Sequence, residues 1–171
     1  MEGSNVAIHH PNREKAGSKA TKAGVVLLML VSAALIAVVL IGGWSQMAGA
    51  EIVAIGYIAV YLIMAFFVAA RWSRGVLPLA AGLSLLFISM AAVAAPAWFA
   101  RDKVGLNDPA LPPGLLGLLI LVLIAVQALL IIFAMRGFTQ EWNVEVEVSH
   151  DDDGGYGDDG YADGSPQPQQ A

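Results

Sequence analysis

The chain has 171 residues, of which 57% are hydrophobic and only 13% charged, and its formal net charge is -5. Its mean hydropathy of +0.67 exceeds the usual balance of soluble proteins, so composition predicts an integral membrane protein. The chain has no cysteine, which excludes a disulfide, a thiolate metal site and a thiol nucleophile.

Charge is segregated along the chain. Residues 1–23 carry a net charge of +2 and residues 24–136 again +2, whereas residues 137–171 carry nine acidic residues and no basic one. We therefore expect three parts: a basic, polar cytoplasmic leader (1–23), a transmembrane domain (24–136) and an acidic, mostly disordered cytoplasmic tail (137–171). From Asp151 onward the tail is too rich in Asp, Gly, Pro and Gln to bury the apolar surface that would offset the entropy lost on ordering.

Four apolar runs are long enough to cross a membrane. An α-helix rises about 1.5 Å per residue and needs roughly 20 apolar residues to span a hydrocarbon layer of about 30 Å. Because lipid offers no hydrogen-bonding partners to exposed backbone, each run must be helical. The predicted fold class is all-α integral membrane, a four-transmembrane-helix bundle with disordered termini. The spans, none of which contains a charged residue, are about 24–44, 52–70, 76–99 and 115–135.

The connections between the spans differ in length. The links at 45–51 and 71–75 are short, so the helices that they join are predicted to run antiparallel. The link at 100–114 contains Asn107, Asp108 and three prolines, a composition that predicts an exposed loop.

The orientation follows from the basic residues in short flanks, because Lys and Arg are retained on the cytoplasmic side. Placing both termini inside leaves only Arg101 and Lys103 outside. We therefore expect a protein of the plasma (inner) membrane with its N-terminus and C-terminus in the cytoplasm. The seven basic residues on the cytoplasmic side are then Arg13, Lys15, Lys19, Lys22, Arg71, Arg74 and Arg136.

The first span has an alternative interpretation as a signal peptide. Ala48 and Ala50 follow it in the small-x-small pattern of a signal-peptidase site. However, the run is longer than the roughly 7–15 residues of a typical signal core, and a polar leader precedes it. We therefore expect the first helix to be retained, with cleavage after Ala50 as the alternative.

The spans contain no ionisable Asp, Glu, Lys, Arg or His, which argues against a proton relay or an ion-coupled carrier. A pore or carrier for neutral solutes, built by oligomerisation, is not excluded by this absence. The most polar group at this depth is Gln127, about midway along the fourth span. We expect its amide to form an inter-helix hydrogen bond, and a place in a solute path is the alternative.

Two further patterns concern helix faces. Tyr57, Tyr61 and Met64 recur at i, i+4 and i+7 and share one face of the second helix. We expect this face to be packing surface, with a pocket for a quinone, lipid or other apolar ligand as the alternative. Pro96 is expected to kink or end the third helix. Close approach of a neighbouring helix to the third one is predicted by its small residues Ala80, Ser84, Ala91 and Ala95.

No residue pattern predicts a catalytic, cofactor-binding or metal site. His9 and His10 lack further ligands at metal-binding spacing, and the run 151–153 of aspartates lacks the spacing of a calcium loop. A phosphate-binding glycine loop, a nucleophile elbow and paired catalytic carboxylates are also missing from the sequence. We therefore expect no cofactor and no enzymatic activity.

The start of the acidic tail alternates valine with glutamate, the period of a short strand that needs a partner edge. Such a segment is suited to docking a basic protein partner, with Val144, Val146 and Val148 adding a strand to the partner's sheet and Tyr156 and Tyr161 serving as anchors. A solubilising extension without a specific partner is the alternative.

Together these patterns predict a small integral membrane protein that acts as a non-enzymatic accessory or scaffold subunit of a membrane complex. The alternative is a small channel or carrier for an uncharged or apolar solute, formed by an oligomer. The expected partners are membrane lipid and either another protein or further copies of the chain, and not nucleic acid. Patterns of Ala, Leu, Val and Ile occur in many unrelated four-span proteins, so they point to no particular family.

Overall fold

The computed structural model of the chain describes residues 6–101 and 109–149, which form two units. One unit comprises residues 10–145, and the other combines residues before 10 with residues after 145. The tail from residue 150 onward, with its predicted disorder and the predicted anchors Tyr156 and Tyr161, lies outside the described residues.

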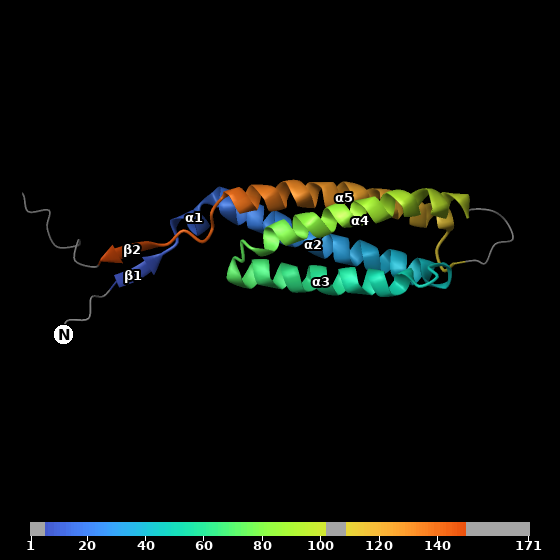
Figure 1. Cartoon of the computed structure of the whole chain (residues 1–171), viewed down its shortest axis with the longest axis horizontal. Coiled ribbons are helices and arrows are strands. Elements are labelled where there is room, and N and C mark those ends of the chain that lie inside the picture. Colours follow the sequence, from blue (N-terminus) through green and yellow to red (C-terminus); the bar gives the residue numbers. More distant parts are fainter. Residues whose placement is uncertain (1–5, 102–108, 150–171) are drawn as a thin grey trace, which may run out of the picture. The chain divides into compact units, whose positions relative to one another are not determined.

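Four long helices make up the larger unit and lie side by side along their length (Figure 1). Each is long and apolar enough to cross a membrane. The predicted fold class is confirmed: the chain is an all-α four-helix membrane bundle. The helices are α2 (Ala16–Gly43), α3 (Ala50–Arg71), α4 (Val76–Ala100) and α5 (Pro113–Thr139), with a one-turn helix α1 (Pro11–Glu14) before α2 and a 3-10 turn η1 (Trp44–Gln46) after it.

Two helices extend well beyond the apolar runs that predicted them. Helix α2 begins at Ala16, within the expected leader, because residues 16–23 contain alanines and lysines that favour a helix. Helix α5 continues to Thr139, past the apolar run that ends at Met135. Helix α4 runs through Pro96 to Ala100, so the proline does not end it. A proline this close to the carboxyl end of a helix removes one backbone hydrogen bond and leaves few later turns to disturb.

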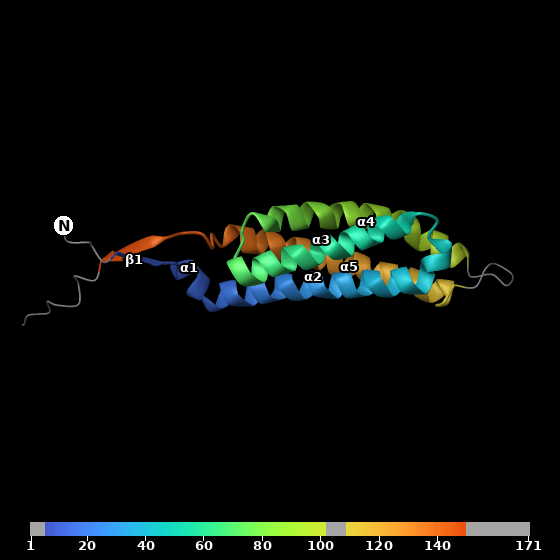
Figure 2. The same ribbon diagram turned by 90° about the horizontal axis from the view of Figure 1, so that it is seen from below.

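By their contacts the helices follow the neighbour order α3–α2–α5–α4. Figure 2 shows α3 in front of α5, with α4 above them and α2 below. Helix α2 packs along both α3 and α5, and α4 packs most extensively along α5, whereas α3 and α4 make little contact. The bundle therefore consists of two sequence-local hairpins, α2–α3 and α4–α5, which meet chiefly through α2 and α5.

The two ends of the bundle differ in charge. We call one end the basic end, where α2 begins and α5 ends and where Lys22, Arg74 and Arg136 lie. We call the other the loop end, where α2 ends and α5 begins. There the backbone N–H of Leu111 donates to the carbonyl of Gly42 over 3.1 Å, which fastens the segment before α5 to the end of α2. The turn into α3 depends on Gly49, whose φ of +96° is a conformation that glycine adopts at little cost.

The second unit contains a two-stranded antiparallel ladder. Strand β1 (Val6–His9) pairs with strand β2 (Val146–Ser149), with His9 opposite Val146 and Val6 opposite Ser149. The strand predicted over 144–148 thus forms two residues later, and its partner edge comes from the chain's own leader. Strand β1 was not predicted from the sequence, because four residues are too few for an alternating pattern to stand out.

Candidate functional site

Four polar side chains, one from each long helix, meet near the middle of the bundle. They are Ser32 of α2, Tyr61 of α3, Ser84 of α4 and Gln127 of α5, and all four are fully buried. We call them the polar layer. Above and below it the core is apolar, apart from a few buried polar groups near the basic end.

The side chains of the polar layer form a chain of hydrogen bonds in which each donates to the next. The amide Nε2 of Gln127 donates to Ser32 Oγ over 3.0 Å, and the phenol of Tyr61 donates to Gln127 Oε1 over 2.7 Å. Tyr61 Oη also lies 3.4 Å from Ser84 Oγ. Because the single phenolic proton is given to Gln127, the Ser84 hydroxyl is the donor in this longer contact. The Ser32 hydroxyl in turn donates a hydrogen bond to the carbonyl of Leu28 over 2.7 Å.

The polar layer closes the middle of the bundle. Among the described residues no buried side-chain nitrogen or oxygen lacks a hydrogen-bonding partner, so the layer has no free group that calls for a solute or a water. The network joins the two helical hairpins across the centre of the bundle. The buried polar cluster therefore has the geometry of an inter-helix connection.

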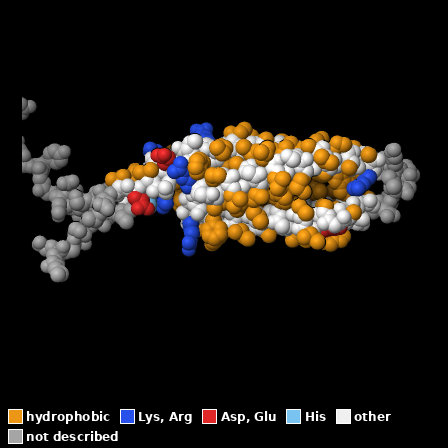
Figure 3. Space-filling view, viewed as in Figure 1, with side chains coloured by type: hydrophobic (Ala, Val, Ile, Leu, Met, Phe, Trp, Pro, Cys, Tyr) orange, Lys and Arg blue, Asp and Glu red, His pale blue; other side chains and the backbone are white. Residues whose placement is uncertain are grey.

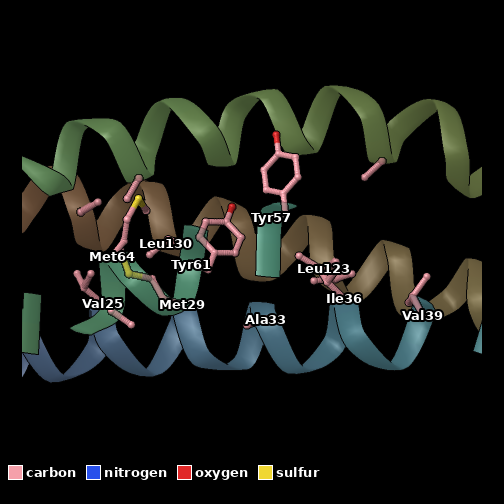
Figure 4. Packing of buried hydrophobic residues seen from close by; sticks show 14 of the residues in the cluster. Val25, Met29, Ala33, Ile36, Val39, Tyr57, Tyr61, Met64, Leu123 and Leu130 are labelled. Carbon is pink, nitrogen blue, oxygen red and sulfur yellow. The ribbon is translucent and has the colours of Figure 1, made fainter. Parts of the chain in front are cut away.

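The half of the core between the polar layer and the basic end is formed mainly by buried apolar side chains. Met64 of α3 lies there beside Met29 and Val25 of α2 and Leu130 of α5 (Figure 4). Met64 is thus a packing residue and does not line the cavity described next. Figure 4 also shows the Tyr57 and Tyr61 rings pointing from α3 toward α4.

The half of the core toward the loop end contains a cavity of about 340 Å³. All four long helices contribute to its walls, and a hollow is visible on this part of the face drawn in Figure 3. Its inner lining includes Tyr57, whose ring lies edge-on to Phe87 with centroids 5.1 Å apart. Of the three residues predicted to share a face of α3, only Tyr57 lines this cavity; Tyr61 belongs to the polar layer.

Among the residues that the structure describes, one charged side chain lines the cavity, at its loop end. Arg101, the residue that follows α4, is half-buried, and its Nη1 donates to the backbone carbonyl of Gln46 over 3.3 Å. Its guanidinium also lies 5.1 Å from the centre of the Trp98 ring, within the range of a cation–π contact. The cavity therefore combines apolar walls with a positive charge at one end.

The basic end is closed by a buried tryptophan that was not predicted from the sequence. Trp142, beyond the end of α5, is fully buried, and its ring lies edge-on to Trp72 at 5.4 Å between centroids. Its Nε1 donates to Gln140 Oε1, and Gln140 Nε2 donates to Thr21 Oγ1, each over 3.0 Å. The only sequence signal was a tryptophan seven residues after the end of the last apolar run.

Basic side chains hold the same region together. Arg13 Nε donates to the Trp142 carbonyl over 2.8 Å, and Arg74 Nε donates to the Phe138 carbonyl over 2.7 Å. The Lys22 ammonium lies 3.9 Å from the centre of the Trp72 ring. We call the group of Arg13, Lys22, Arg74, Trp72 and Trp142 the basic cap. It ties the segment before α2 to the segment after α5.

The predicted docking valines are only partly described. Val144 and Val146 have exposed fractions of 37% and 45%. Val146 begins strand β2, and Val148 lies two residues later in the strand, opposite Ala7. Val144 precedes the strand, and its backbone N–H donates to the Glu141 carbonyl. Docking of a protein partner by these valines stays a prediction.

Comparison of the chain with protein-family models, with curated proteins and with solved structures gave no match.

Proposed function

We propose that the protein is a non-enzymatic accessory or scaffold subunit of a complex in the plasma membrane, with both termini in the cytoplasm. The observation that carries the proposal is the polar layer. Its donors and acceptors satisfy one another at the centre of the bundle, so a single copy offers no ready path for a solute through its middle. A closed bundle acts on other molecules through its surfaces and termini.

The basic cap supports the cytoplasmic orientation. Arg13, Lys22 and Arg74 belong to the cap, and Arg136 is exposed at the same end. In membrane proteins with short loops such a concentration of positive charge is retained on the cytoplasmic side. The cap also gives the tail a defined point of origin, because it fixes the backbone around Trp142.

The acidic tail is the proposed docking element. Residues 137–171 carry nine carboxylates and no basic side chain, so anionic lipid of a cytoplasmic leaflet repels them and a basic protein surface attracts them. Val144, Val146 and Val148 add apolar contacts to this attraction. The partner in this proposal is a protein with a basic docking surface.

A channel or carrier for an uncharged or apolar solute is the second candidate, and the cavity beside Tyr57 favours it. The polar layer separates that cavity from the basic end, so transport requires either a separation of the helices or a path between copies. Transport through a single copy therefore requires the hydrogen bonds of Gln127 to break, whereas the accessory role leaves them intact.

The test is purification of the full chain in mild detergent, followed by identification of proteins present at a fixed ratio. Deleting residues 151–171 should leave the bundle inserted and remove the partner. A full-length variant in which every aspartate from Asp151 onward is changed to Asn should have the same two effects. High salt should release the same partner from the unmodified chain. A homo-oligomer that retains no other protein and conducts a neutral solute in liposomes would refute the accessory role.

A further inference from the structure

The cavity at the loop end has apolar inner walls and a cationic side chain at one end. Its inner part is lined by Ile36, Tyr57, Phe87 and Leu123, and the polar atoms there are already engaged, since the Tyr57 hydroxyl donates to the Leu83 carbonyl over 3.4 Å. Its loop end holds Arg101. A group that fills this space must be apolar along its length and must tolerate, or gain from, a cation at one end.

The neighbour order of the helices gives such a molecule a route. Helices α3 and α4 both line the cavity and make little contact with each other, unlike the other neighbouring pairs. Their outer faces carry exposed apolar side chains such as Leu62 and Leu86, the surface expected to meet lipid tails. A lipid chain can therefore enter from the side, between α3 and α4, without crossing the polar layer.

We propose that this cavity binds one acyl chain of an anionic membrane phospholipid, whose phosphate is held by Arg101. Arginine has five N–H donors in a planar fork that matches phosphate oxygens, and the described residues take one of them, through the carbonyl of Gln46. The Trp98 ring beneath the guanidinium holds that fork in place.

The volume and the charge decide against other occupants. A cavity of about 340 Å³ lies at the low end of the roughly 300–1,000 Å³ typical of small-molecule sites, so it takes part of one chain rather than a whole lipid. A zwitterionic phospholipid brings its own cation toward Arg101 and loses part of the attraction. A quinone lacks the anionic head that Arg101 would hold. The inference is independent of the accessory role, since it concerns a different surface of the molecule.

The experiment measures lipid binding to the full chain by native mass spectrometry in detergent, titrated with phosphatidylglycerol and, separately, with phosphatidylcholine of the same chain length. Arg101→Gln removes the charge at the cavity, and Arg136→Gln is its matched control at the basic end. Ala94→Phe fills the cavity from α4, and Ala92→Phe is its matched control, because Ala92 lies on the exposed face of the same helix. Melting temperatures of all variants show whether the bundle still folds.

We expect the unmodified chain to bind one phosphatidylglycerol in preference to phosphatidylcholine. Arg101→Gln should weaken phosphatidylglycerol binding about tenfold and remove the preference, because a charge-assisted hydrogen bond is lost. Ala94→Phe should abolish binding of that lipid, and both control variants should bind it as the unmodified chain does. Equal affinity for the two lipids, or tight binding that survives both Arg101→Gln and Ala94→Phe in folded protein, would overturn the proposal. Preferential binding of free palmitate over phosphatidylglycerol would overturn the choice of a phospholipid.

Discussion

The phenol of Tyr61 donates to the amide oxygen of Gln127 over 2.7 Å, and neither side chain has any exposed surface. The bond joins α3 to α5, two helices that lie diagonally across the bundle and do not pack along each other. It is therefore a contact across the middle of the bundle, and it depends on the hairpins being docked in one arrangement.

Removing the Gln127 amide should destabilise the bundle. In Gln127→Leu the Tyr61 hydroxyl loses its acceptor and Ser32 loses a donor, so we expect a loss of about 1–2 kcal/mol in the free energy of unfolding. The measurement is SDS-induced unfolding in mixed micelles. Combining Gln127→Leu with Tyr61→Phe should cost less than the sum of the two single changes. Ser89→Ala, on the exposed face of α4, is the control and should change stability by less than about 0.5 kcal/mol. Strict additivity of the two core variants would contradict the hydrogen bond.

Adding a methyl group at Gly43 should also destabilise the bundle. A Cβ there would lie 2.7 Å from the edge of the buried Trp98 ring, so we expect Gly43→Ala to cost about 1–3 kcal/mol. Gly56 of α3 has open space around the same position, and Gly56→Ala should leave stability unchanged or raise it by up to about 1 kcal/mol. Thermal unfolding of both variants in one detergent compares them. Equal melting temperatures for the two variants would show that Gly43 is not a close-approach position.

Truncating Trp142 should open the basic cap. The ring is fully buried, and we expect Trp142→Ala to cost about 3 kcal/mol and to expose the segment around Arg13 to trypsin. Limited proteolysis in detergent followed by mass spectrometry measures the cleavage. Trp44→Ala serves as the control, because that ring is 55% exposed at the loop end and should leave cleavage near Arg13 unchanged. Unaltered protection in Trp142→Ala would mean that the cap does not hold this segment.

The proposed orientation predicts which residues can be labelled from outside the cell. The chain has no cysteine, so single cysteines at Ser73 and at Asn107 report on the two faces without a background. In intact cells an impermeant maleimide should react at position 107 and not at position 73, and both should react after lysis. The reverse pattern would place the termini outside and would remove the basis for a cytoplasmic docking tail.

Hydropathy predicted the four helices well because uninterrupted apolar runs of this length have one outcome in lipid. Their ends were less predictable: Ala16 starts α2 because helix propensity continues where hydropathy has already fallen. The need of Gln127 for a partner was also readable from the sequence, since an unpaired amide is costly in lipid. That its partners are Ser32 and Tyr61 was not readable, because periodicity identifies a helix face and not the neighbour that the face meets.

The cavity and the basic cap lay beyond sequence reasoning for a related reason. The cavity is lined by both α3 and α4, which make little contact with each other, and this arrangement depends on how two hairpins dock and not on a pattern within either. Trp142 follows the last apolar run in a polar segment, so nothing local marks it as buried. In the sequence, Arg101 contributed only to the prediction of membrane orientation, as a basic residue that flanks a span. Its position beside an apolar cavity is seen only in the folded structure.

The three side-chain hydrogen bonds between helices in the polar layer all run from one hairpin to the other, and none lies within a hairpin. During synthesis the α2–α3 hairpin enters the membrane first and leaves Ser32 and Tyr61 without their later partners. Arrival of the α4–α5 hairpin supplies Ser84 and Gln127 together. The hydrogen bonds of the layer are therefore complete only once the whole chain is inserted, and in a nascent chain without α5 the Tyr61 hydroxyl lacks its Gln127 acceptor.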